Sequence, residues 1–240
     1  MAKYESAWDM LALDPPGWGG VLLTGAVSTV QIALLAYFLG MAIGLFGALG
    51  KLNGPKPLQA LLGGYTTIIR AVPELILVVS LYYAGTDGLN YLLDIMGVGP
   101  VNVSGFVAAV FVLGFVQGAY HTEVMRAAIL AIPIGQIEAA KAFGMNGWKR
   151  FSRIIFPTMM ANAIPGLANL WMIIVKDSAL VAVVGYQELA LATRQAAGMT
   201  KSYFMFYLAA GALYLLITLI SNQVFKYAER HVRRGQPSLG

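Results

Sequence analysis

The sequence predicts an all-helical protein embedded in a membrane, with five transmembrane helices. Of its 240 residues, 58% are hydrophobic and only 11% are charged, whereas about 25% of the residues in a typical soluble domain are charged. Charged residues are absent from four long stretches, residues 15–50, 95–122, 154–175 and 202–225. Each stretch reaches or exceeds the roughly 20 apolar residues that cross a bilayer as a helix. This composition excludes a soluble globular domain.

The apolar runs set the positions of the five helices. A transmembrane barrel is excluded, because its strands alternate apolar and polar residues and these runs do not. The second helix is interrupted by Arg70, Pro73 and Glu74, and the third carries Glu123 and Arg126. The helices are expected at residues 20–49, 58–84, 104–131, 155–175 and 204–227.

The lysines and arginines outside these helices predict the orientation. Ten of them lie in connections 50–57 and 132–153 and in the tail 226–240, and four lie in the N-terminal tail and the alternate connections. Because Lys and Arg concentrate on the cytoplasmic side of membrane proteins, we expect the N-terminus outside and the C-terminus inside. The formal net charge of +5 therefore reflects topology, and no nucleic-acid partner is expected.

This topology divides the chain into three parts. An extracytoplasmic tail is expected over 1–19, a transmembrane domain over 20–231, and a cytoplasmic tail over 232–240 that lies close to anionic membrane lipid. The segment 178–193 is apolar but too short to cross the membrane. It is expected to form either a short helix at the outer surface or a re-entrant segment folded against the bundle, and the short, gate-like outer helix is favoured.

The sequence offers no metal or cofactor site. It has no cysteine, and His121 and His231 are too far apart in the chain to form a recognisable metal site. His121 is expected to pack between helices. The fragment nearest to a phosphate-binding loop, residues 47–51, lacks both the spacing and the Ser or Thr that such a loop needs. We therefore expect no catalytic residue and no ATP hydrolysis in this chain.

A short helix is predicted in connection 132–153. Pro133 ends the preceding helix, residues 136–143 are good helix formers, and Gly144 is suited to the left-handed position that often ends a helix. Two helical turns are unstable alone in water, so docking into a partner's groove would stabilise them. The alternative is an ordinary connector.

The same connection resembles a known family. Glu138-Ala139-Ala140, Gly144, Ile154 and Phe156-Pro157 resemble the signature loop of ABC-importer permease subunits, with Phe156 in place of the usual leucine. Residues 70–74, 119–126 and 176–185 are similar to segments of the polar amino acid permeases. The stretch from Gly64 to Arg70 is closest to the histidine/arginine-type permeases. The resemblance covers about residues 20–234.

Fold, partners and substrate follow from this resemblance as expectations. It implies a type I ABC importer permease bundle in the bacterial inner membrane, with the coupling-helix loop over 132–157. The expected partners are a dimer of cytoplasmic ATP-binding subunits, a second permease subunit that is paralogous or identical, and a periplasmic substrate-binding protein. The implied substrates are basic amino acids or arginine-derived compounds such as opines. The residues expected to couple to the ATPase are Gln136, Glu138, Ala139, Ala140, Phe143 and Gly144.

Two other functions are compatible with the same features. An ion-coupled secondary transporter would use the membrane-embedded charges for proton or sodium coupling. A non-transporting membrane scaffold would use connection 132–153 to recruit a cytoplasmic partner.

Ionisable residues within membrane helices are costly, so each is a candidate functional residue. We expect Glu74, Glu123 and Asp177 to line a cavity for a cationic side chain, with Tyr120 hydrogen-bonded to the ligand and Ser178 beside Asp177. The alternative is that nearby basic residues neutralise these acids. That alternative is favoured for Glu123, which lies three residues before Arg126 on the same helix face. The basic residues concerned are Arg70, Arg126 and Lys176.

Small residues predict where the helices approach one another. Gly40 and Gly44, Gly47 and Gly50, and Gly114 and Gly118 are spaced three or four residues apart, which places each pair on one helix face. We expect these faces to pack within the subunit.

Overall fold

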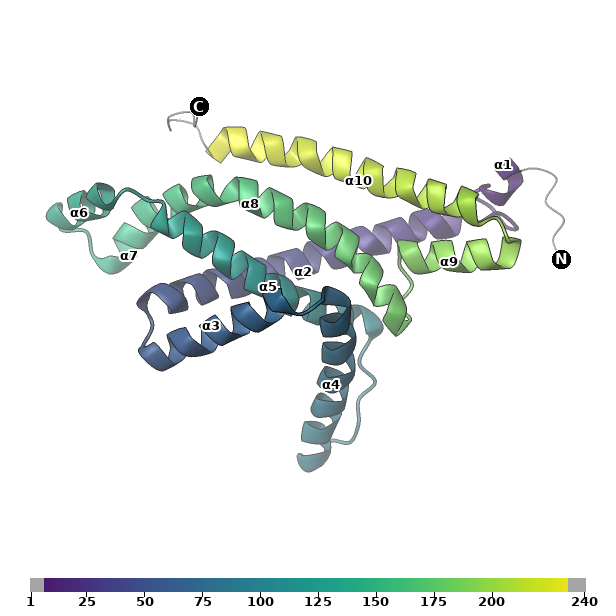
Figure 1. Cartoon of the computed structure of the whole chain (residues 1–240), viewed down its shortest axis with the longest axis horizontal. Helices are drawn as coiled ribbons and strands as arrows, with labels where there is room; N and C mark the ends of the chain where they lie inside the picture. Colours follow the sequence, from purple (N-terminus) through teal and green to yellow (C-terminus); the bar gives the residue numbers. More distant parts are fainter. Residues whose placement is uncertain (1–6, 233–240) are drawn as a thin grey trace.

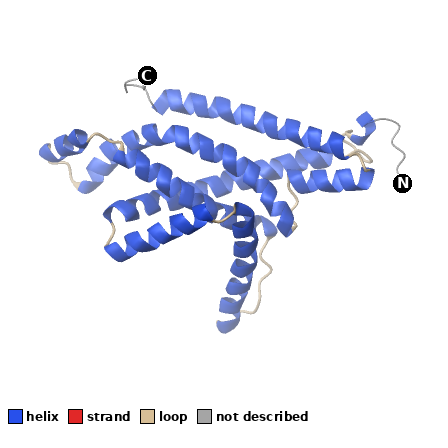
Figure 2. Cartoon of the chain, in the orientation of Figure 1, coloured by secondary structure: helices blue, strands red, loops and turns tan. Residues whose placement is uncertain are grey.

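The computed structural model describes residues 7–232, and helices joined by short loops make up this part of the chain (Figure 2). It contains no strand among these residues. The ends of the two predicted tails, residues 1–6 and 233–240, lie outside the described residues. The elements are α1 (Ala7–Met10), α2 (Gly19–Asn53), α3 (Lys56–Ala71), α4 (Glu74–Ile95), α5 (Gly105–Leu130), α6 (Ile134–Ala142), α7 (Gly147–Arg150), the π-helix η1 (Phe151–Ile155), α8 (Phe156–Asp177), the 3₁₀-helix η2 (Ser178–Val184), α9 (Leu189–Thr200) and α10 (Tyr203–Val232).

Long helices α2, α5, α8 and α10 run along the length of the molecule, and α4 projects away from them (Figure 1). Within the described residues, four helical segments are long and apolar enough to cross a membrane, and α3 with α4 provides a fifth if that bent pair is one span. The α2–α3 turn, α6, α7 and the end of α10 lie toward one end of the molecule. The start of α2 and helix α9 lie toward the other end. This arrangement brings the predicted cytoplasmic connections to the same end.

The second predicted helix is divided more sharply than its sequence indicated. The chain bends by 119° between helices α3 and α4. Helix α4 continues to Ile95, beyond the predicted end at residue 84. Pro73 has no N–H group, and it forces the residue before it out of the helical region. Val72 accordingly has extended backbone angles, with φ −93° and ψ 139°.

The predicted outer helix over 178–193 is two elements. Helix η2 continues α8 directly and ends at Gly185, which adopts a left-handed conformation with φ 85°. Helix α9 then begins at Leu189. Glu188 caps its first turn by accepting hydrogen bonds from the backbone N–H groups of Ala190 and Leu191, at 2.9 and 2.8 Å. The side chain of Glu188 is fully buried.

Glycines set the distance between α2 and α5. A Cβ atom added at Gly44 would overlap His121 of α5, and one added at Gly47 would overlap the Thr122 side chain. On the other helix, Gly114 and Gly118 leave space for Leu39 and Ile43 of α2. The prediction that these glycine faces pack within the subunit is confirmed.

We predict that Gly44→Ala lowers the free energy of unfolding by about 1–3 kcal/mol, because the added methyl group forces two backbones apart. Thermal unfolding of the purified complex measures this change. Gly211→Ala is the matched control, since a Cβ atom at the exposed Gly211 of α10 meets no atom within 4 Å. Equal effects of the two substitutions would contradict the role assigned to close packing at Gly44.

Candidate functional site

Helix α6 has the form that the sequence predicts for the short helix. It spans Ile134–Ala142, and Gly144 follows it with φ 70°. The N–H of Gly144 donates to the carbonyl of Lys141, and the N–H of Met145 donates to that of Ala140, at 2.9 and 3.0 Å. These two bonds form a Schellman ending, which requires a left-handed residue at Gly144.

One side of α6 is open to a partner. Among the predicted coupling residues, only Ala140 is buried, and the others are exposed. Phe143 is 85% exposed, and a large aromatic side chain that is this exposed often marks a surface that contacts another protein. This surface therefore has the properties of a docking site.

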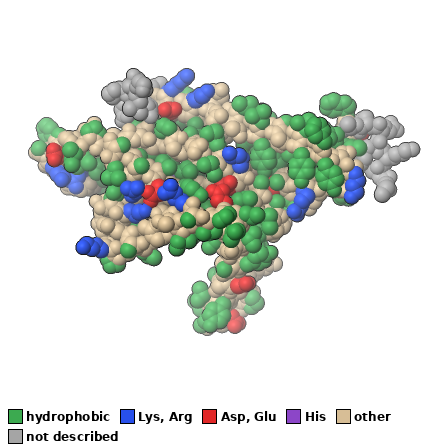
Figure 3. All heavy atoms as spheres, viewed as in Figure 1, with side chains coloured by type: hydrophobic (Ala, Val, Ile, Leu, Met, Phe, Trp, Pro, Cys, Tyr) green, Lys and Arg blue, Asp and Glu red, His purple; other side chains and the backbone are tan. Residues whose placement is uncertain are grey.

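Three of the predicted substrate-binding residues come together near the C-terminal end of α8. The Glu74 carboxylate, in the first turn of α4, lies beside the Asp177 carboxylate and close to the Tyr120 hydroxyl. All three side chains are half-buried. The break between α3 and α4 thus brings Glu74 of α4 close to Asp177 of α8 and to Tyr120 of α5. Acidic side chains are visible near the middle of the face shown in Figure 3, with basic ones close by.

The two carboxylates of this cluster are not neutralised by an ion pair. Within the described part of the chain, no Lys, Arg or His nitrogen lies within 4.0 Å of either Glu74 or Asp177. Asp177 accepts one hydrogen bond, from Gln117 Nε2 at 3.3 Å. Adjacent carboxylates repel each other, so a cation between them would be stabilised.

Ser178 lies next to Asp177 in the chain, but its side chain is turned away from this cluster. It is fully buried, and its hydroxyl donates to the carbonyl of Val175 at 2.8 Å. Its hydroxyl therefore helps to hold the junction between α8 and η2.

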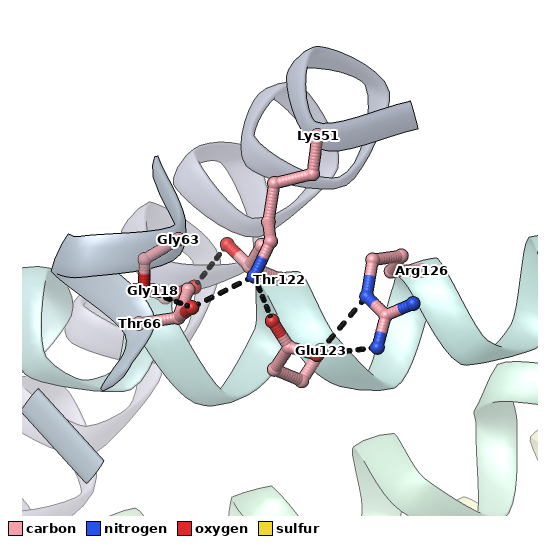
Figure 4. A network of polar contacts seen from close by, with 7 residues as sticks. All are labelled: Lys51, Gly63, Thr66, Gly118, Thr122, Glu123 and Arg126. Carbon is pink, nitrogen blue, oxygen red and sulfur yellow. Dashed lines mark hydrogen bonds and ion pairs between the residues drawn. The ribbon is translucent and has the colours of Figure 1, made fainter. Parts of the chain in front are cut away.

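Glu123 lies in a separate network that joins α2, α3 and α5 (Figure 4). It accepts a hydrogen bond from Lys51 Nζ at 2.5 Å and two from the Arg126 guanidinium at 2.8 and 3.0 Å. Lys51 also donates to Thr66 Oγ1 at 2.9 Å. The Glu123–Arg126 ion pair that the spacing favoured is present. With two basic partners, this carboxylate is already neutralised.

Two residues of these networks were not singled out from the sequence. Lys51 was counted as a connection residue, but α2 continues past the apolar run and places Lys51 one turn after Gly47, on the face that meets α5. Gln117 is uncharged and lies in an apolar run, so no charge pattern marks it. The spacing of Gly44, Gly47 and Lys51, which places the three on one helix face, could have indicated that Lys51 faces α5.

His121 packs between helices, as expected. Its ring is fully buried, lies edge-on to Tyr37 with centroids 4.9 Å apart, and contacts the Gln117 carbonyl through Nδ1 at 2.9 Å. Within residues 7–232 there is no group of three His, Asp or Glu residues that could hold a metal ion. Residues 47–51 lie inside α2 and form no phosphate-binding loop.

The comparison with known families accounts for these features together. Residues 20–234 match the family described as "Binding-protein-dependent transport system inner membrane component". The chain belongs to this family. It is therefore the membrane permease of an ABC importer, a class of transporter in which a separate subunit hydrolyses ATP. Of the three functions that the sequence allowed, this membership selects the importer subunit.

Relatives of the permease cover nearly its whole length. The histidine/lysine/arginine/ornithine transport system permease protein HisQ of Escherichia coli (strain K12) is 41% identical over 219 residues, which are 91% of this chain and 96% of that protein. The octopine transport system permease protein OccQ of Rhizobium radiobacter is 37% identical, over 94% of this chain and 96% of that protein. The nopaline transport system permease protein NocQ of Agrobacterium fabrum (strain C58 / ATCC 33970) is 40% identical, over 94% of this chain and 97% of that protein.

Solved structures agree on the fold of the permease. An amino acid ABC transporter crystallised with histidines has a TM-score of 0.74 and 30% identity, covering 89% of this chain and 95% of that one. The inward-facing MetNI methionine ABC transporter has a TM-score of 0.73 at 20% identity, over 89% of this chain and 96% of that one. The fold is that of a type I ABC importer permease.

We predict that Lys51→Met lowers the free energy of unfolding by about 2 kcal/mol, because it removes one of two cations from a carboxylate that is only 17% exposed. Thermal unfolding of the purified complex provides the measurement. Lys56→Met, at an exposed lysine of α3, is the control. The double variant Lys51→Met/Glu123→Gln should lose less than the sum of the single losses, and strict additivity would contradict an energetic coupling of the pair.

Proposed function

We propose that this permease imports basic amino acids, or arginine-derived compounds such as opines, across the bacterial inner membrane. The observation that carries the proposal is the pair of adjacent carboxylates, Glu74 and Asp177, which has no ion-pair partner in the described chain. A guanidinium or ammonium group is the ligand that such a pair stabilises best. Tyr120, beside Glu74, offers a hydroxyl to the same ligand.

The names of the relatives support this choice of substrate class. HisQ belongs to a transport system for histidine, lysine, arginine and ornithine, and OccQ to one for octopine. Under this proposal Glu74, Tyr120 and Asp177 bind the substrate directly. Glu123 and Ser178 contribute by holding the surrounding helices in place, since each is occupied by contacts within the chain.

The proposed topology has five spans, with α3 and α4 forming one bent span, the N-terminus outside and the C-terminus inside. The transmembrane domain covers residues 20–231, between the tails 1–19 and 232–240. Its support is the ten-to-four excess of Lys and Arg in the predicted cytoplasmic connections and tail of the sequence. The α2–α3 turn, α6 and α7 lie together at one end of the structure (Figure 1).

The proposed assembly contains two ATP-binding subunits, a second permease that is paralogous or identical, and a periplasmic substrate-binding protein. Loop 132–157 would dock into the ATPase through Gln136, Glu138, Ala139, Ala140, Phe143 and Gly144. ATP binding would favour one conformation only if that conformation binds nucleotide more tightly.

A chain of contacts would carry movement of α6 to the substrate. Helix α6 follows α5 after a short turn in which Ile132 is buried. Glu123 of α5 is tied through Lys51 to Thr66 of α3. Helix α3 ends at the break before Glu74, so a shift of α5 would move one of the two carboxylates relative to the other. The proposed mechanism is alternating access driven by this shift.

Asp177→Asn should weaken uptake of arginine more than uptake of a neutral amino acid carried by the same complex, because it removes the charge that a cationic side chain needs. For a charge-assisted contact we expect roughly a tenfold to hundredfold weaker apparent affinity. Radiolabelled uptake by proteoliposomes containing the full complex and the binding protein measures both substrates.

The matched control is Asp94→Asn, which removes an exposed carboxylate near the far end of α4. It should leave both uptake rates unchanged. Equal losses for arginine and the neutral substrate in Asp177→Asn would show that the charge does not select the substrate.

Gly144→Leu should abolish uptake while the complex still assembles, because a branched side chain at φ 70° strains the ending of α6 and alters its docked surface. Co-purification of the ATPase and uptake are measured separately. Gly88→Leu is the control, since that glycine of α4 has open space around it and an ordinary backbone conformation. Full uptake by Gly144→Leu would contradict the role assigned to α6.

A further inference from the structure

A cavity of about 600 Å³ lies between part of α6 and the ends of α2 and α5. Its lining comes from the last turns of α2 and α5 on one side, and from α6, α7 and η1 on the other. The substrate carboxylates do not contribute to it. In the proposed orientation this cavity lies at the cytoplasmic ends of α2 and α5.

The two sides of the cavity differ in chemistry. The ends of the long helices contribute apolar side chains, among them Leu49, Leu52 and Ile129. The connecting elements contribute two basic residues, Lys141 of α6 and Arg150 of α7. No acidic residue lines the cavity. A ligand with an anionic group next to hydrocarbon would match both sides.

The two basic residues are available to such a ligand. In the described part of the chain, neither Lys141 nor Arg150 has an acidic group within ion-pair distance. Arg150 is half-buried and Lys141 is exposed. A half-buried guanidinium without a counter-ion favours the arrival of an anion.

The lining of the cavity shares no residue with the predicted ATPase contact of α6. Ile137 and Lys141, one turn apart, line the cavity, whereas Glu138, Ala139 and Phe143 do not and are exposed. A partner docked on the exposed face would leave the cavity on the bundle side of α6. The cavity therefore needs an occupant other than that partner.

We propose that this cavity binds an anionic phospholipid of the inner leaflet, with Lys141 and Arg150 holding its phosphate and the ends of α2 and α5 contacting its acyl chains. The proposal rests on the orientation given under the proposed function. Basic cavities between membrane helices on the cytoplasmic side are suited to anionic lipid headgroups. The apolar lining favours a lipid over a free phosphate ion, which would have to shed water against hydrocarbon.

Bound lipid would support α6 from the bundle side. The helix is short, and three of its residues line the cavity, so what fills the cavity helps to set its position. An empty cavity would let α6 move without moving α5, and a filled one would make the two move together. Anionic lipid is thereby expected to improve the coupling of ATP hydrolysis to transport.

The test is a lipid-binding measurement on the intact complex, purified with its partner subunits in a non-ionic detergent. Phosphatidylglycerol or phosphatidylcholine is titrated in, and native mass spectrometry counts the lipids retained per complex. The wild type should retain phosphatidylglycerol in preference to phosphatidylcholine. Lys141→Gln and Arg150→Gln should each weaken its apparent affinity for phosphatidylglycerol about fivefold, with little change for phosphatidylcholine.

Lys149→Gln is the matched control, because Lys149 is an exposed neighbour of Arg150 that does not line the cavity. It should retain phosphatidylglycerol as the wild type does. If Lys149→Gln lost as much as Arg150→Gln, general surface attraction would explain the binding and the cavity site would be refuted.

Two further outcomes would also decide the proposal. If Lys141→Gln and Arg150→Gln released the ATPase but kept phosphatidylglycerol, an acidic segment of that partner would be the occupant and the lipid site would be refuted. If either variant fails to assemble, the charge-preserving Lys141→Arg and Arg150→Lys variants should keep the wild-type lipid preference, and its loss would overturn the proposal. Lipid retention is measured without transport, so it remains readable even if the substrate of the permease is not a basic amino acid.

Discussion

The close approach of α2 to α5 is the constraint on which the rest of the structure depends. Without a hydrophobic driving force between helices in lipid, packing contacts at short range hold a bundle together. At Gly44 the backbone of α2 lies against the backbone of α5, and at Gly47 it lies against the Thr122 side chain, so that a Cβ atom would fit at neither position. One turn later on the same face, Lys51 reaches Glu123. The same packing that joins the helices therefore determines which acid in the membrane is neutralised.

This arrangement gives different partners to the three acids that the sequence suggested for substrate binding, Glu74, Glu123 and Asp177. Glu123 has two basic partners and ties α5 to α2 and, through Lys51, to α3. Glu74 and Asp177 lie beside each other without such partners, near the C-terminal end of α8. One carboxylate holds helices together, and two remain available to a cation. The role of a charged side chain in a membrane helix therefore depends on the residues around it, and the presence of the charge alone does not define that role.

The features that could be predicted from the sequence depend on local chemistry. The long apolar runs, the break at Pro73 and the left-handed Gly144 at the end of α6 follow from residue type and spacing. The 119° bend and the pairing of Lys51 with Glu123 depend on how helices far apart in sequence pack, which no local pattern records. For the same reason Ser178, adjacent to Asp177 in sequence, could not be known to turn away from it.

The bend at Pro73 also solves a problem of hydrophobic mismatch. If α3 and α4 were one straight rod from residue 56 to residue 95, it would be about 60 Å long, roughly twice the thickness of the hydrocarbon core. Such a rod would have to tilt steeply or leave several apolar turns in water. Folding the rod into two arms lets a segment that is too long for one straight crossing fit within a membrane, with Glu74 at the bend.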